Sequence, residues 1–146
     1  ELDRAIEQEF PPKARYEVQI RRAYAQGLPP LQMQRGHLRE MLLNLLINAR
    51  EATHDRGNIE VTAQSNQDYH VTFTVRDDGP GIPPDRVEKI FEPYFTTKEK
   101  GSGLGLAIVK HNAEIYGGTV RVESELGKGS LFVVTLPAKT MMRLRK

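Results

Sequence analysis

Two asparagines, Asn44 and Asn48, stand four residues apart in the apolar stretch EMLLNLLINAREA. In a helix this spacing places both amides on one face, and Glu40 and Glu51 extend the polar stripe by one turn in each direction. Buried amides need hydrogen-bond partners or ligands, because burial without them costs free energy. The pair could cap a neighbouring loop, or it could offer amide oxygens to a hard cation such as magnesium.

A second candidate site follows an apolar strand, in the stretch VRDDGPGI. An aspartate at a strand end, here Asp77, can accept a hydrogen bond from an exocyclic amine such as that of adenine. Gly79 and Gly81 would let the backbone pass close to a flat ring. The alternative interpretation is an ordinary Asp-Gly turn.

The stretch GSGLGL, residues 101–106, opens a helix with closely spaced glycines. Exposed backbone N–H groups at a helix N-terminus attract phosphate, although a flexible hinge would have the same composition. The spacing is neither the dinucleotide-binding fingerprint nor a Walker loop.

Just before this glycine-rich stretch, the sequence IFEPYFTTK, residues 90–98, sets aromatic residues beside hydroxyls and a lysine. That composition suits a lid over phosphates, or simply core aromatics.

Hydrophobic periodicity predicts the elements that must hold these residues. Apolar residues at helical spacing predict a long helix over about 37–54, and alternation predicts strands. We expect strands at 17–24, 59–63, 69–75, about 120–122 and 130–136, and further helices at 84–91 and 103–116. Strands that adjoin one another, interrupted by three helices, indicate an α+β, two-layer sandwich with a mixed sheet and about three helices on one face.

The composition narrows the function classes. The 146 residues, 38% of them hydrophobic, are the size of one domain with a core. A net charge of +2 gives no argument for nucleic acid, and the lack of cysteine excludes disulfides and thiolate metal sites. No apolar run approaches the roughly 20 residues of a membrane helix. Because the chain starts at Glu1, we expect an excised domain of a longer parent.

Taken in order, these stretches resemble the ATP-binding catalytic domain of bacterial sensor histidine kinases. Residues 44–49 are similar to its N box, 77–82 to its G1 box, 90–98 to its F box and 101–106 to its G2 box. The resemblance covers residues 16–137 and implies the Bergerat fold. The short interval between the last two boxes is similar to the short-lid group of nitrogen-regulation and oxygen-sensing kinases.

The resemblance implies that the chain binds ATP and Mg²⁺. Asn48, with Asn44 beside it, would ligate the metal, and Asp77 would accept from the adenine amino group. Residues 95–102 would form a lid that is mobile without nucleotide. The full set of implied ligand-binding residues is Asn44, Asn48, Glu51, Asp77, Gly79, Gly81, Ile82, Phe95, Thr96, Thr97, Lys98, Gly101, Ser102, Gly103, Leu104, Gly105 and Leu106.

Two departures from the superfamily matter. Hydrolysing members carry a glutamate at the position of Asn44, and an amide cannot act as that general base. Many histidine kinases carry a lysine where this chain has Glu51, which puts a direct phosphate contact there in doubt.

None of the four histidines has the sequence context of a phosphoacceptor. They are His37, His54, His70 and His111. We therefore expect a protein histidine kinase's catalytic half that binds ATP but does not phosphorylate itself.

The implied organisation is a linker or a remnant of a dimerisation helix at 1–15, the catalytic domain at 16–137 and a basic tail at 138–146. The expected partners are a histidine-bearing dimerisation domain of the same parent and a downstream response regulator. We expect a homodimeric, cytoplasmic or membrane-anchored parent, a monomeric isolated domain, and no nucleic-acid or membrane contact by this domain. The alternatives are an anti-sigma-type serine kinase and a nucleotide-gated interaction module without transfer.

Overall fold

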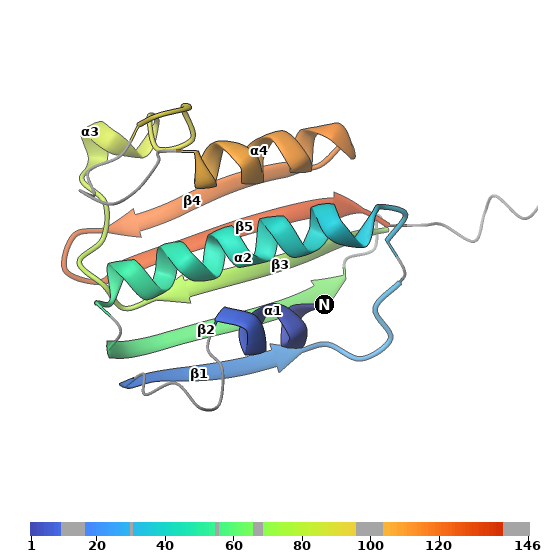
Figure 1. Cartoon of the computed structure of the whole chain (residues 1–146), viewed down its shortest axis with the longest axis horizontal. Helices are drawn as coiled ribbons and strands as arrows, with labels where there is room; N and C mark the ends of the chain where they lie inside the picture. Colours follow the sequence, from blue (N-terminus) through green and yellow to red (C-terminus); the bar gives the residue numbers. More distant parts are fainter. Residues whose placement is uncertain (10–16, 30, 55, 66–68, 96–103, 139–146) are drawn as a thin grey trace, which may run out of the picture.

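The computed structural model describes residues 1–9, 17–29, 31–54, 56–65, 69–95 and 104–138 as a sheet with helices on one face (Figure 1). The helices are α1 (Leu2–Glu9), α2 (Arg35–Ala52), α3 (Pro84–Val87) and α4 (Gly105–Ile115). The strands are β1 (Glu17–Tyr24), β2 (Arg56–Ser65), β3 (His70–Asp77), β4 (Thr119–Glu125) and β5 (Gly129–Pro137). The two-layer α+β prediction is confirmed, and the helix expected over 84–91 is a single short turn, α3.

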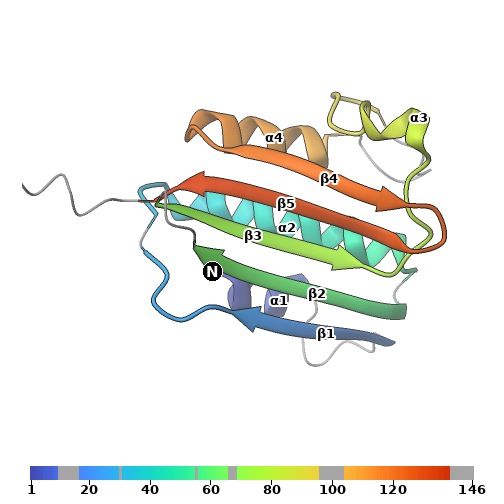
Figure 2. The same cartoon turned by 180° about the vertical axis from the view of Figure 1, so that it is seen from behind.

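The five strands follow the order β1-β2-β3-β5-β4. β1 pairs with β2 in parallel, and the other neighbouring pairs are antiparallel, so the sheet is mixed. Seen from behind, the opposite face of the sheet is not covered by any helix of the described residues (Figure 2). Strand residues on that face are therefore mostly polar, with a Thr62–Thr74 hydroxyl contact across β2 and β3.

The core lies between the sheet and the helices. The helical repeat of α2 buries one face, and the period-two alternation of β2, β3 and β5 buries the other side of the same core. Phe91, which follows α3 in the chain, packs edge-to-face on the buried Phe132, with ring centroids 6.2 Å apart. Within the described residues no helix is both long and apolar enough to cross a membrane.

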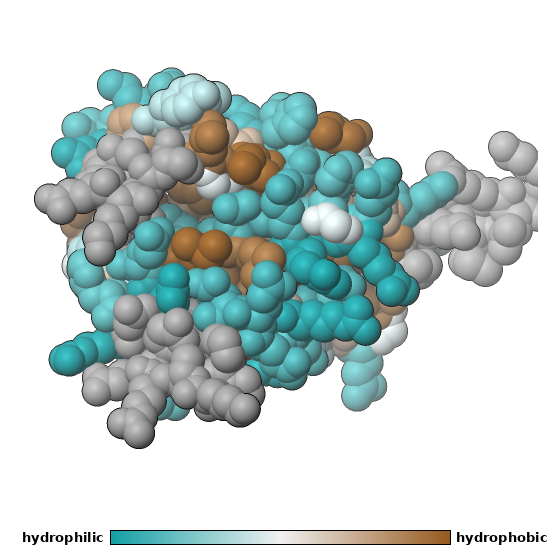
Figure 3. Space-filling view, viewed as in Figure 1, coloured by the Kyte–Doolittle hydropathy of each residue, from teal (hydrophilic) through white to brown (hydrophobic). Residues whose placement is uncertain are grey.

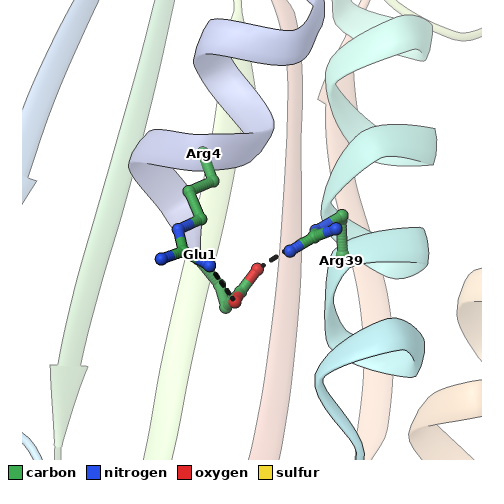
Figure 4. Close-up of polar contacts among 3 residues, drawn as sticks. All are labelled: Glu1, Arg4 and Arg39. Atoms are coloured by element: carbon green, nitrogen blue, oxygen red, sulfur yellow. Dashed lines mark hydrogen bonds and ion pairs between the residues drawn. The ribbon is translucent and has the colours of Figure 1, made fainter.

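The helix α1 lies within the stretch that the sequence suggested was a linker or a helix remnant. Its Ala5 and Ile6 are buried in the core. The carboxylate of Glu1 lies between Arg4 and Arg39 of α2, with its Oε2 3.3 Å from Arg39 Nε (Figure 4). Further ion pairs join α1 to its surroundings: Asp3–Arg22 at 2.8 Å and Glu9–Arg50 at 2.7 Å. The segment 2–9 is therefore packed into the domain.

Candidate functional site

The helix α2 is the central element of the candidate site, because it carries both asparagines at the border of the core. Asn44 and Asn48 are half-buried, while the adjacent Leu45 and Leu46 are buried against the sheet. The Asn44 Nδ2 atom donates to the backbone oxygen of Glu40 at 2.8 Å. That bond leaves the amide oxygen of Asn44 on the side of α4. Glu51, one turn beyond Asn48, is also half-buried.

The first residue of α4 lies against Asn44. A Cβ atom built on Gly105 would lie 3.0 Å from Asn44 Oδ1, so the amide oxygen and the helix start are in close contact. Leu104 is the N-cap of α4, and its own apolar side chain cannot supply a capping hydrogen bond. The positive end of the α4 dipole is thus directed to the part of α2 that carries Asn44. Leu106, one residue further, is half-buried against the core.

Asp77 ends β3 and faces the helices, because the alternation that buries Val71, Phe73 and Val75 continues to it. It is only 2% exposed. Its Oδ1 accepts from the Gly79 backbone N–H at 2.9 Å. A Cβ on Gly79 would lie 2.7 Å from the Ala52 carbonyl oxygen. The glycine turn therefore passes the C-terminal end of α2, where a side chain at position 79 has no room.

The next glycine turn is tethered to the hairpin between β4 and β5. Gly81 has a φ of 81° and packs against the backbone of Glu125. The Ile82 N–H donates to Ser124 Oγ at 2.7 Å, and the Ser124 hydroxyl donates to the Gly129 carbonyl at 3.1 Å. Ser124 lies between the strands expected at about 120–122 and at 130–136, and its anchoring role was not predicted. A serine three residues before the Gly-Lys-Gly turn, Gly127 to Gly129, was the signal available.

Asp78, beside Asp77, faces solvent and has a different role. It accepts from the Asn58 backbone N–H at 2.9 Å and from Asn58 Nδ2 at 2.8 Å. The hydrogen bond from the Asn58 backbone, and then that from its side chain, hold the pKa of Asp78 below its ordinary value. Asp78 thus fastens the glycine turn to the start of β2.

The remaining predicted residues divide into two groups. Phe95 is described, is half-buried and packs against the core, whereas the adjacent Tyr94 is 75% exposed with a φ of 66°. Thr96, Thr97, Lys98, Gly101, Ser102 and Gly103 lie outside the described residues, as does most of the expected lid.

The described residues therefore converge on one edge of α2. Gly105 contacts it at Asn44 and Gly79 at Ala52, eight residues or about 12 Å apart along the helix, and Asn48 lies midway. On the helical face, hydrophobic surface forms separate patches over α2 and α4, surrounded by hydrophilic residues (Figure 3). The arrangement offers a buried carboxylate at one end, amide oxygens in the middle and a helix N-terminus at the other.

A magnesium ion would fit this donor set. The described residues contain no group of three His, Cys, Asp or Glu able to hold a metal by themselves. Magnesium commonly takes one or two protein oxygens and completes its shell with phosphate oxygens and water. Asn48, with Asn44 a turn before it, would be the source of such protein oxygens.

Comparison with known proteins gives the family. The model of the family "Histidine kinase-, DNA gyrase B-, and HSP90-like ATPase" matches residues 33–140. The sensor histidine kinase ZraS of Salmonella typhimurium is 44% identical over 121 residues, which cover 83% of this chain and 26% of ZraS. The chain belongs to this family, and the relatives it matches are sensor histidine kinases.

Solved structures of histidine kinases have the same fold as this chain. Full-length ShkA in complex with AMPPNP has a TM-score of 0.84 and 37% identity, covering 95% of this chain and 29% of ShkA. The catalytic domain of the histidine kinase ThkA has a TM-score of 0.76 and 30% identity, covering 94% of this chain and 85% of that domain. The chain thus has the fold of a histidine kinase ATP-binding catalytic domain, and it spans about a quarter of the length of ZraS.

Proposed function

We propose that this chain binds Mg-ATP along α2 and presents the γ-phosphoryl group to a histidine on a separate dimerisation domain. The observation that carries the proposal is the convergence on α2 of the buried Asp77 and the two close-packed glycines, Gly79 and Gly105. The adenine amino group would lie at Asp77, and the phosphates would lie between Asn48 and the start of α4. Thr97, Lys98 and the backbone of 101–105 remain proposed phosphate contacts.

The chain's own residues bind and orient the nucleotide. Bound magnesium would supply charge neutralisation for the phosphates. Asn44 and Asn48 would hold amide oxygens toward it, and the α4 N-terminus would add a fixed positive potential. Transfer of the γ-phosphoryl group depends on how the nucleotide is positioned rather than on covalent chemistry by the protein. The contribution of this chain to the reaction would therefore be the rigid packing of α2 against α4 and β3, which orients the nucleotide.

Neither self-phosphorylation nor hydrolysis is expected of this chain. Asn44 stands where hydrolysing relatives carry a glutamate, and an amide is no base. The neighbouring Glu40 is held by a hydrogen bond to Asn112 on α4. Of the histidines, His37 is engaged at 2.6 Å with Tyr116 Oη, and His54 and His111 are exposed, without the sequence context of an acceptor.

The proposed context is a sensor kinase of the short-lid group. In that context residues 16–137, together with the packed helix α1, are the catalytic domain. The dimerisation domain and a response regulator are the partners, and the parent is a homodimer. The close packing of α1 against α2 supports counting residues 2–9 with the catalytic domain.

A transfer assay tests the proposal. The purified chain is incubated with γ-labelled Mg-ATP, alone and with a histidine-bearing dimerisation domain from a sensor kinase such as ZraS. We expect acid-labile label on the dimerisation domain only, and only in the mixture containing this chain. Acid-labile label on the isolated chain would contradict the assignment of its histidines. Rapid phosphate release by the chain alone would place it with the hydrolysing members, and label on serine would favour the serine-kinase alternative.

A further inference from the structure

The helices α2 and α4 lie side by side in opposite directions (Figure 1), and close contacts join them at three levels. At one end the Tyr116 hydroxyl accepts from the Gln34 backbone N–H at 3.3 Å and lies 2.6 Å from His37 Nδ1. At the other end Gly105 contacts the Asn44 amide. Between them Asn112 is hydrogen-bonded to Glu40. The middle contact restrains Glu40 and also joins the two helices one turn away from Asn44.

Asn112 is a buried amide on the apolar face of α4. It is 4% exposed, and its neighbours Val109 and Ala113 are fully buried. Its Nδ2 donates to Glu40 Oε1 at 2.9 Å. Hydrogen bonds to a carboxylate are stronger and more directional than those between neutral groups. An apolar residue at position 112 would fill the core, so the amide serves the link to α2 rather than packing.

Glu40 joins this link to the candidate site. Its side chain accepts from Asn112, while its backbone oxygen accepts from Asn44 Nδ2 at 2.8 Å. The second bond sets the Asn44 amide so that its oxygen contacts Gly105 at the start of α4. One residue of α2 therefore holds both the body of α4 and the amide that touches its N-terminus.

We propose that Asn112 and Glu40 are positioning residues that set the α4 N-terminus relative to Asn44 and Asn48 for the phosphate half of Mg-ATP. The inference rests on the proposed function, because it assigns that half to α4. The adenine half is held elsewhere, by Asp77 and the glycine turn at Ala52. Loss of the Glu40–Asn112 bond therefore weakens binding of the triphosphate and leaves recognition of the base intact.

The test is a charge-preserving exchange across the pair. Asn112→Asp places two carboxylates face to face, and Asn112→Leu removes the donor without adding charge. Both variants should bind Mg-ATP roughly two- to thirtyfold more weakly than wild type. Adding Glu40→Gln to Asn112→Asp restores a donor and an acceptor at unchanged net charge, and it should return Mg-ATP affinity to within about twofold. Adenosine affinity, followed by NMR titration, should be the same in all four proteins.

The exposed Glu114→Gln on α4 is the matched control, and thermal unfolding confirms that each variant is folded. If the folded Asn112 variants bind Mg-ATP as wild type does, the positioning role is wrong. Equal losses for adenosine and Mg-ATP would assign the bond to the fold alone and would also overturn it. Where Asn112→Leu does not fold, failure of the exchange to restore affinity decides against the inference. A wild-type chain that binds no Mg-ATP would instead overturn the proposed function, and this inference with it.

Discussion

At the scale of single residues, the neighbours Asp77 and Asp78 show how strand geometry separates two roles. Asp77 takes the inward position of β3 and is buried, whereas Asp78 turns outward to the Asn58 amide. The lowered pKa of Asp78 means that its contribution to stability is present above the ordinary aspartate pKa. That contribution is lost as the pH falls through the lower folded value. The adenine-binding role that we propose is therefore assigned to the buried Asp77 and not to the exposed Asp78.

Asn48 should act through the metal. Asn48→Ala removes an oxygen ligand without touching the adenine end, so we expect it to reduce Mg-ATP affinity more than metal-free ATP affinity. Titrations with magnesium and with a chelator measure the two affinities. Gln64→Ala, an exposed amide of β2, serves as the control and should change neither. Equal losses with and without magnesium would remove the metal-ligand assignment.

The sequence predicted the residues with local signatures and missed those defined by packing. Asp77 was predicted because it follows an alternating strand and precedes spaced glycines. Ser124 was not predicted, because its hydroxyl accepts a hydrogen bond from the backbone N–H of Ile82, 42 residues away in the chain. Asn112 was not singled out either, because its partner Glu40 lies 72 residues away, on another helix.

At the scale of elements, close contacts between backbones position the site. Gly79→Ala would push a methyl group against the Ala52 carbonyl, and the turn or the end of α2 must then move. We expect a loss of about 1–3 kcal/mol in the free energy of unfolding and weaker ATP binding. Denaturant unfolding and ATP titration measure both.

Gly36→Ala is the matched control for that substitution. Gly36 lies in the first turn of α2, and a methyl group on its Cα would have no atom within 4 Å. Alanine there should stabilise the protein by up to about 1 kcal/mol, because glycine is a poor helix former. A Gly79→Ala variant as stable as Gly36→Ala would show that the turn does not press on α2.

The contact between α1 and β1 should affect how the free energy of unfolding depends on pH in the alkaline range. Burial, with a smaller effect of the nearby Asp3 carboxylate, raises the pKa of Tyr24 to about 12, and its hydroxyl donates to Asp3 Oδ1 at 3.1 Å. An ordinary tyrosine has a pKa of about 10. The stabilisation by neutral Tyr24 is therefore complete below about pH 10 and is lost as the pH rises from about 10 to 12.

Tyr24→Phe isolates this effect from other groups that ionise at alkaline pH. The free energy of unfolding should fall less steeply between about pH 9 and pH 11.5 in the variant than in wild type. In a titration followed by the ultraviolet absorbance of tyrosinate, the variant should lack the most alkaline step of the wild-type curve. Identical slopes in the two proteins would contradict the anchoring of α1 through Tyr24.

At the scale of the whole molecule, segments beyond the family match complete the fold. The matched region begins at residue 33, yet β1 adds a parallel edge strand and α1 adds Ala5 and Ile6 to the core. Alternation predicted β1, but eight residues of α1 were too short and too polar to separate from a linker. The layer order followed from the sequence, whereas the strand order β1-β2-β3-β5-β4 depends on long-range pairing that no local pattern contains.

The central claim, that the site along α2 binds ATP with Asp77 at the base, is tested most directly by calorimetric titration of Mg-ATP into wild type and Asp77→Asn. Oδ1 of Asp77 already accepts from the Gly79 N–H. A substituted amide would keep its oxygen there and turn its NH₂ group toward the adenine amine, setting donor against donor. We expect binding by wild type and by the exposed Asp85→Asn control, and a loss of about 2–3 kcal/mol or more in folded Asp77→Asn. Undiminished affinity in folded Asp77→Asn, or no binding by wild type, would contradict the account.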